Sequence, residues 1–274
     1  MLSRIKKALT DPFFPNKCQA CGLFFHAKKT GQSDKILINK SFHDPMETLF
    51  CRIMAPFLCL ECRKDFSAIH SPFCSQCGRM FKSRTGTDHL CGDCIKKKKR
   101  AHCIRSAGIY SGSLMPVIHA LKYHGKLQLA RPLGKLLFYA YMKYYDINTI
   151  DLIIPIPLHI SRLKKRGFNQ AIMLLNKWPH FMHETRETES EIYINDQNLI
   201  RNRKTVSQTG LSRKKRKQNV KNAFTVTDPS KILKKRILLV DDVFTTGATA
   251  EECAKTLINN GAETVSVLTL ARTA

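Results

Sequence analysis

The chain has 274 residues, enough for one sizeable core and a smaller module, and its 43% hydrophobic content excludes a disordered polymer. Its apolar stretches are only strand-sized and residues 1–16 have no apolar signal-peptide core, so we expect no membrane insertion and a cytoplasmic location. With 46 basic against 21 acidic residues, the formal net charge of +25 favours polyanionic partners without distinguishing nucleic acid, anionic lipid and phosphorylated metabolites.

Cysteine dominates the first part of the chain. Ten of the 11 cysteines precede residue 104, and eight of them form four Cys-x-x-Cys pairs: Cys18/Cys21, Cys59/Cys62, Cys74/Cys77 and Cys91/Cys94. In an intracellular chain this usage favours metal ligation over disulfides. Two such turns complete a tetrahedral site, so the eight thiolates predict two structural Zn²⁺ ions with no open coordination position. Consecutive pairing is the simplest arrangement, and an interleaved one stays open.

The composition changes near residue 104, which predicts two domains. Residues 1–103 would form a double zinc-ribbon module, and residues 104–274 an α/β domain. The long insertion between Cys21 and Cys59 leaves open whether the first ribbon is intact.

Strand and helix patterns alternate in the second part of the chain. We expect strands at 107–110, 151–156, 236–240 and 264–270, and helices at 114–124, 129–141, 171–178 and 248–260. Strand, helix and strand in this order predict a parallel sheet with right-handed crossovers and helices on both faces, an α/β fold. Residues 179–196, which include a small acidic cluster, look like a surface insertion without a readable role.

The segment 237–249 contains the strongest functional signal. A buried strand ends in Asp241 and Asp242, and a loop of small residues from Thr245 to Thr249 then opens a helix. Unpaired N–H groups and the helix dipole, worth about 0.3–1 kcal/mol, favour a phosphate there. Two carboxylates would repel that phosphate, so they predict a second ligand group such as a ribose. A capped turn alone explains the threonines but not the adjacent acids.

This segment resembles the phosphoribosyl pyrophosphate (PRPP) motif of type I phosphoribosyltransferases, which have a Rossmann-like parallel sheet. The resemblance implies that Asp241 and Asp242 hold the ribose 2′- and 3′-hydroxyls, and that Mg²⁺ accompanies the pyrophosphate. The remaining PRPP-binding residues would be Phe244, Thr245, Thr246, Gly247, Ala248 and Thr249.

Further segments resemble the ComF family of competence-associated, phosphoribosyltransferase-like proteins with an N-terminal double zinc ribbon. The matching residues are 121–125, 155–159, Arg162, 165–170, Arg203, Gln208, Leu211, Arg216, 219–220 and 223–224. The resemblance covers nearly the whole chain. The insertion after Cys21 and the acidic stretch at 184–191 depart from it.

A rigid Pro-containing turn followed by cations predicts a pyrophosphate site, because several positive charges can clasp the leaving group. Its residues would be Pro155, Leu158, Arg162, Lys165, Arg166, Gly167, Asn169 and Gln170. Asp241 and Asp242 would position the ribose, and Arg203 would join Arg162 and Arg166 in stabilising departing charge. Residues 203–210 could form a closing loop, and His159 is interpreted as a loop histidine rather than a base.

Two functions stay open. One is a metabolic phosphoribosyltransferase that passes the ribosyl group of Mg-PRPP to an unidentified acceptor, such as an amine or nucleobase. The other, implied by the ComF resemblance, is a role in natural competence and DNA uptake, with PRPP as a regulatory or vestigial ligand. Its partners would be single-stranded DNA, bound through the zinc ribbon and basic patches, and competence-machinery proteins. Five basic runs support the second: 96–100, 162–166, 201–204, 213–217 and 231–236.

Overall fold

The computed structural model describes residues 15–26, 45–83, 85–96, 99–185, 193–205 and 212–274. Most of the insertion after Cys21, most of the acidic stretch, residues 206–210 of the predicted closing loop, and the ComF-like positions Gln208 and Leu211 lie outside the described residues. Among the residues described, no helix combines the length and the apolar character needed to cross a bilayer.

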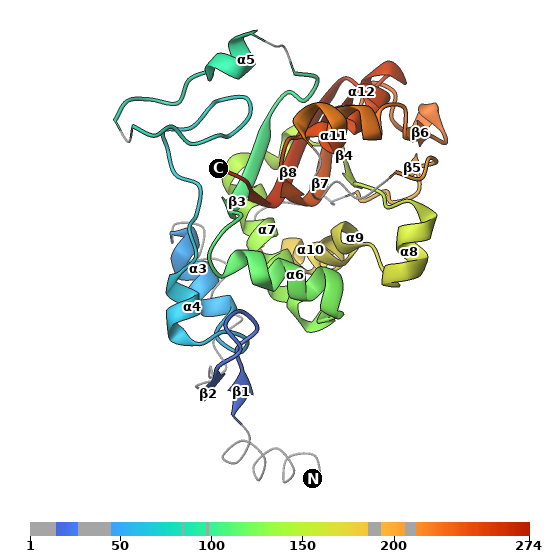
Figure 1. The fold of residues 1–274 in the computed structure, drawn as a ribbon. Helices are drawn as coiled ribbons and strands as arrows, with labels where there is room; N and C mark the ends of the chain where they lie inside the picture. Colours follow the sequence, from blue (N-terminus) through green and yellow to red (C-terminus); the bar gives the residue numbers. More distant parts are fainter. Residues whose placement is uncertain (1–14, 27–44, 84, 97–98, 186–192, 206–211) are drawn as a thin grey trace.

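A four-stranded parallel sheet forms the centre of the chain (Figure 1). Its strand order is β3 (Ile104–Ile109), β8 (Thr264–Arg272), β7 (Arg236–Phe244) and β4 (Leu152–Pro155), with every neighbouring pair parallel. The middle strands β7 and β8 are almost entirely buried, as their long runs of Val, Ile and Leu require of a sheet covered on both faces. The predicted parallel α/β sheet is confirmed.

Helices cover both faces of this sheet. α7 (Ala130–Tyr144) and α9 (Gln170–Leu175) contact the strands from one side, and α12 (Ala248–Asn259) lies on the other (Figure 1). α7 and α9 approach so closely that a Cβ added at Gly134 would lie 2.4 Å from the carbonyl oxygen of Leu174. The remaining helices of this half are α6 (Leu114–His124), α8 (Ile160–Arg166), α10 (Trp178–Thr185), α11 (Arg213–Val220) and the 3₁₀ turns η2 (Leu127–Leu129), η3 (Ile147–Thr149) and η4 (Pro229–Lys231).

Several predicted boundaries were wrong. β7 continues past Val240 to Phe244, because β8 pairs with its last residues and places Asp241 opposite Thr269. β3 begins at Ile104 and β8 ends at Arg272, both longer than predicted. In place of the helix expected at 171–178, the structure has two helices, α9 and α10. Pro179 lies in the first turn of α10, where its missing N–H is tolerated, but it would break one continuous helix through this segment.

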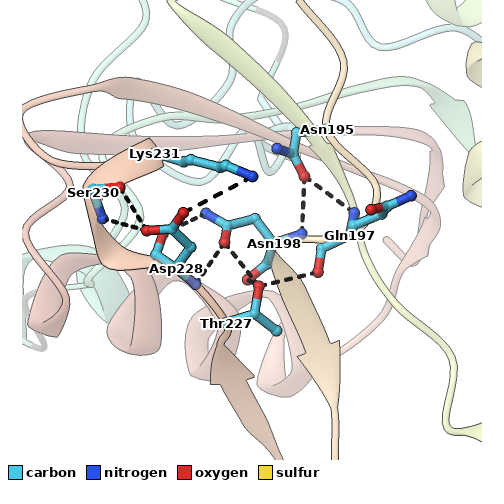
Figure 2. Close-up of polar contacts among 7 residues, drawn as sticks. All are labelled: Asn195, Gln197, Asn198, Thr227, Asp228, Ser230 and Lys231. Atoms are coloured by element: carbon cyan, nitrogen blue, oxygen red, sulfur yellow. Dashed lines mark hydrogen bonds and ion pairs between the residues drawn. The ribbon is translucent and has the colours of Figure 1, made fainter.

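A small antiparallel sheet, which the sequence did not predict, pairs β5 (Leu199–Arg201) with β6 (Phe224–Val226). Figure 2 shows the polar network that closes its end, centred on the amide of Asn198. Asn198 Oδ1 accepts hydrogen bonds from Thr227 Oγ1 and the Asp228 N–H, both at 2.9 Å, while its Nδ2 donates to the Asp228 carbonyl at 3.0 Å. This satisfied, buried amide holds β5 against β6 and thereby positions Arg201.

The N-terminal segment packs directly onto the α/β half. It contains β1 (Asn16–Lys17), β2 (Phe24–Phe25), α3 (Met46–Ile53), α4 (Leu60–Lys64) and α5 (Gly92–Lys96). One core joins side chains of α3 with those of α7, and a second joins cysteines at 74–94 with β7, β8 and α12. The division into two domains at residue 104 stays a prediction.

Candidate functional site

The eight paired cysteines form two clusters. Cys18, Cys21, Cys59 and Cys62 form the first cluster and Cys74, Cys77, Cys91 and Cys94 the second, with all four sulfur atoms of each within 4.8 Å of one another. A tetrahedral zinc ion with Zn–S bonds of about 2.3 Å separates its sulfurs by about 3.8 Å. The Sγ atoms of Cys21 and Cys59 and those of Cys77 and Cys91 are each 3.8 Å apart. The consecutive pairing is what the structure shows, and both clusters fit zinc.

Backbone N–H groups stabilise the thiolates in both clusters. In the second, Cys74 Sγ accepts from the N–H of Cys77 at 3.4 Å and of Cys91 at 3.3 Å. Burial alone would raise the pKa of the Cys74 thiol, but these donors outweigh it and lower the pKa to about 6. Gly78 provides the left-handed turn of the knuckle, with φ of 68°, and a Cβ there would lie 2.6 Å from the Ile104 carbonyl oxygen.

A cavity of about 760 Å³ opens at the carboxyl ends of the sheet strands, the edge where open α/β sheets bind ligands. Residues from two predicted groups that lie far apart in the sequence line this cavity: the PRPP-binding residues and the pyrophosphate residues. The predicted PRPP-binding residues that line it are Asp241, Asp242, Phe244, Thr245, Gly247, Ala248 and Thr249. The predicted pyrophosphate residues that line it are Leu158, Arg162, Arg166 and Gln170.

Several predicted residues support this cavity without lining it. Asn169 is buried, donates through Nδ2 to the Ile156 carbonyl at 3.1 Å and caps α9 through Oδ1, so it holds the turn after β4 in place. Gly167 ends α8 in the left-handed conformation, Pro155 is the last residue of β4, and Lys165 is exposed on α8. Thr246 faces a different cavity.

Arg203 and His159 both bind helix ends. The Arg203 guanidinium donates to the carbonyls of Asn219 at 2.9 Å and Lys221 at 2.7 Å, which satisfies acceptors at the end of α11. His159 is the N-cap of α8, and its Nδ1 accepts from the Ser161 N–H at 3.2 Å. Neither lines the cavity among the residues described, and the catalytic role of Arg203 stays a prediction.

The acidic pair is held by a lysine that the sequence did not indicate as a site residue. Lys122 Nζ of α6 lies 2.7 Å from Asp242 Oδ2, and the two side chains are only 14% and 4% exposed. Burial and the negative charge of Asp242 raise the pKa of Asp241 to about 8, against the opposing effect of Lys122. Lys122 therefore pairs with Asp242, and the raised pKa of Asp241 reflects the cost of placing two carboxylates together in a buried site.

The structure adds further residues to the cavity wall. Arg201 of β5 and Arg216 of α11 bring the number of arginines lining it to four, with Arg162 and Arg166. Arg201 Nη2 donates to Thr205 Oγ1 at 2.5 Å, and the Arg166 guanidinium lies 5.4 Å from the Tyr123 ring. The sequence signals for these residues were the basic runs 201–204 and 213–217, the ComF-like match at Arg216 and the ComF-like segment 121–125. The other added residues are Tyr110, Met115, His119, Ile156, Pro157, Val243, Ala250, Thr269 and Thr273.

Comparison with known proteins connects both parts of the chain to one family. The family model described as a double zinc ribbon domain matches residues 45–95. The DNA utilization protein YhgH of Shigella flexneri is 32% identical over 235 residues, covering 81% of this chain and 99% of that protein. Competence protein F of Haemophilus influenzae is 31% identical over 234 residues, covering 79% and 97%.

The chain belongs to the ComF family. The predicted ComF resemblance is therefore confirmed. Among solved structures, this ComF-family chain is similar to glutamine PRPP amidotransferase from B. subtilis, at 21% identity and a TM-score of 0.31, over 50% of this chain and 25% of that one.

Proposed function

We propose that this ComF-family chain binds Mg-PRPP in the cavity at the carboxyl ends of the strands and acts on single-stranded DNA with other competence proteins. The supporting observation is that one cavity gathers the acidic pair, the small-residue loop and four arginines. These are the complementary groups for a ribose, a phosphate and a pyrophosphate, and no single one of them would suffice.

The 5′-phosphate would lie at the start of α12. Gly247 precedes this helix with φ of 76°, and a Cβ there would lie 2.5 Å from the Phe244 ring, so only glycine allows the loop to fold back this tightly. The loop and the first turn of α12 offer N–H groups without helical acceptors, and the dipole of this 12-residue helix favours an anion. Thr245 and Thr249 line the same wall and add hydroxyl donors.

The ribose hydroxyls would donate to Asp241 and Asp242. Lys122 holds Asp242 in place by their ion pair, so this acceptor is positioned before the ligand arrives. Carboxylate oxygens are also ligands that Mg²⁺ accepts, and Mg²⁺ bound with the pyrophosphate supplies neutralising charge. Arg162 and Arg166, with Arg201 and Arg216, would stabilise the negative charge that grows on the departing pyrophosphate.

The DNA role is supported by the relatives and by the charge of the chain. The two relatives described above are named for DNA utilization and for competence. A formal charge of +25 attracts a polyanion, and such binding weakens steeply as salt displaces it.

Magnesium-dependent PRPP binding, measured by calorimetry, tests the site. The double variant Asp241→Asn with Asp242→Asn removes two carboxylate acceptors, and hydrogen bonds to such groups are each worth about 1.5 kcal/mol or more, so its affinity should fall at least about 100-fold. Glu61→Gln with Asp196→Asn removes two carboxylates at exposed positions and should bind like the wild type. Folded wild type that does not bind PRPP, or a control pair that weakens binding equally, would refute the site.

A further inference from the structure

A second cavity, of about 590 Å³, lies beside the proposed PRPP cavity. Three separate segments form it: the residues just after α5, the last turn of α11, and the start of α12. α11 separates the two cavities, because Arg216 lines one and Lys217 the other, while Ala248 of α12 contributes to both. We call the second cavity the basic cleft, and its lining residues are Asp93, Lys99, Arg100, Lys217, Gln218, Lys221, Thr246, Ala248, Glu251, Glu252 and Lys255.

The acidic side chains of the basic cleft are already engaged by the protein. Glu251 Oε2 accepts from the Arg100 N–H at 3.0 Å, and Glu252 Oε1 accepts from the Asn222 N–H at 2.7 Å. Asp93 Oδ2 lies 3.4 Å from Arg79 Nη2. Glu251 thereby joins α12 to the segment after α5, and Glu252 joins α12 to the segment after α11.

The cations, in contrast, outnumber the acids and are largely unpaired. Lys217 and Lys221 are four residues apart, on one face at the end of α11, and both are exposed. Within the part of the chain that the structure describes, no ion pair joins Lys217, Lys221 or Arg100 to a carboxylate. Lys99 lies over the Phe244 ring at 5.5 Å, and Lys255 lies 3.8 Å from Glu252.

We infer that the basic cleft binds the phosphodiester backbone of single-stranded nucleic acid, next to the PRPP cavity. This inference rests on the proposed function and assigns a location to its DNA-binding part. No aromatic side chain is among the residues lining the cleft, so it offers no surface on which bases stack. Contacts between lysines and phosphates position a strand without reading its sequence, and each one contributes about 0.7 to the salt dependence of single-strand binding.

Fluorescence anisotropy with labelled oligothymidylate, measured over a series of salt concentrations, tests the location. Lys217→Gln with Lys221→Gln should reduce the magnitude of the slope of log affinity against log salt by about 1.4, two contacts at 0.7 each. The matched control is Lys214→Gln with Lys215→Gln, which removes the same charge from exposed positions on the same helix that line neither cavity. The control should keep nearly the wild-type slope.

The outcomes separate the location from the proposed function. Equal slope changes in the two double variants would overturn the basic cleft as a site, since they would show a diffuse field, while leaving DNA binding intact. Wild type without salt-dependent binding would overturn the DNA role itself. PRPP calorimetry on the Lys217/Lys221 variant should match the wild type, and a loss there would mean that the substitutions disturbed the fold. Oligouridylate should bind with a similar slope, because the predicted contacts are to phosphates.

Discussion

The two cysteine clusters have the same ligands and the same pairing but different surroundings. In the first cluster only Cys18 is buried, whereas all four cysteines of the second are. Figure 1 shows α4, which follows Cys59 of the first cluster, far from α5, which contains Cys94 of the second. The first cluster packs into the core with α3 and α7, and the second into the core with the sheet and α12.

The second cluster is connected to the cavity at the strand ends through Arg272. Arg272, the last residue of β8, donates from Nη1 to the Cys77 carbonyl, and its guanidinium lies 5.6 Å from the Phe244 ring. That ring is the group closest to a Cβ placed at Gly247 in the proposed phosphate loop. The same motif, repeated in the N-terminal segment, thus packs with α3 and α7 in the first case and supports a wall of the candidate site in the second.

The largest expected effect comes from removing one ligand of each cluster. Cys74→Ser should release one zinc, destabilise the chain by several kcal/mol and weaken PRPP binding, because apparent zinc-binding free energies of about 10–16 kcal/mol are folding free energy. Cys21→Ser should release the other zinc and leave PRPP binding close to wild type. Zinc content, thermal unfolding and calorimetry on both variants check this, and equal loss of PRPP binding would remove the distinction between the clusters.

The features that could be predicted from the sequence are those whose functional groups lie close together along the chain. The Cys-x-x-Cys pairs and the segment from Asp241 to Thr249 each place their functional groups within one turn or one strand-to-helix junction, so local geometry alone specifies them. The four sheet strands were found from their apolar runs for the same reason. The consecutive pairing of the cysteines was the simplest of the arrangements left open, and the structure selected it.

Long-range contacts explain what the sequence missed. Lys122 reaches Asp242 because α6 and the carboxyl end of β7 line the same cavity, although the two residues are 120 positions apart. Arg272 reaches Cys77 across 195 positions only because of the place of β8 in the sheet. Arg203 was grouped with the leaving-group cations by resemblance, and nothing in the local sequence showed that it would bind the end of α11.

A smaller effect is expected from the arginine that joins the second cluster to the sheet. Arg272→Met keeps a long apolar stem but leaves the Cys77 carbonyl without its buried donor, which should cost about 1–3 kcal/mol. Arg79→Met is the control on the same ribbon, because Arg79 forms only an exposed pair with Asp93 at 3.4 Å, worth about 0–1 kcal/mol. Urea unfolding and the rate of zinc release to a chelator should separate the two, and similar values would mean that Arg272 does not anchor the cluster.

The smallest effect should follow from Phe244→Leu, which alters the contact between Arg272 and the phosphate loop without touching a zinc ligand. Leucine keeps an apolar side chain beneath Gly247 but removes the ring face that both Arg272 and Lys99 approach, and such cation–π contacts are worth about 0.5–2 kcal/mol. Both zinc ions should stay bound, and PRPP affinity should fall by about 1 kcal/mol, roughly fivefold. Phe138→Leu in α7 makes the same change of volume at a buried position that lines neither cavity, so it is the control. If zinc is retained and PRPP affinity is unchanged, the second cluster supports the cavity only through general packing, and the route through Arg272 and Phe244 is wrong.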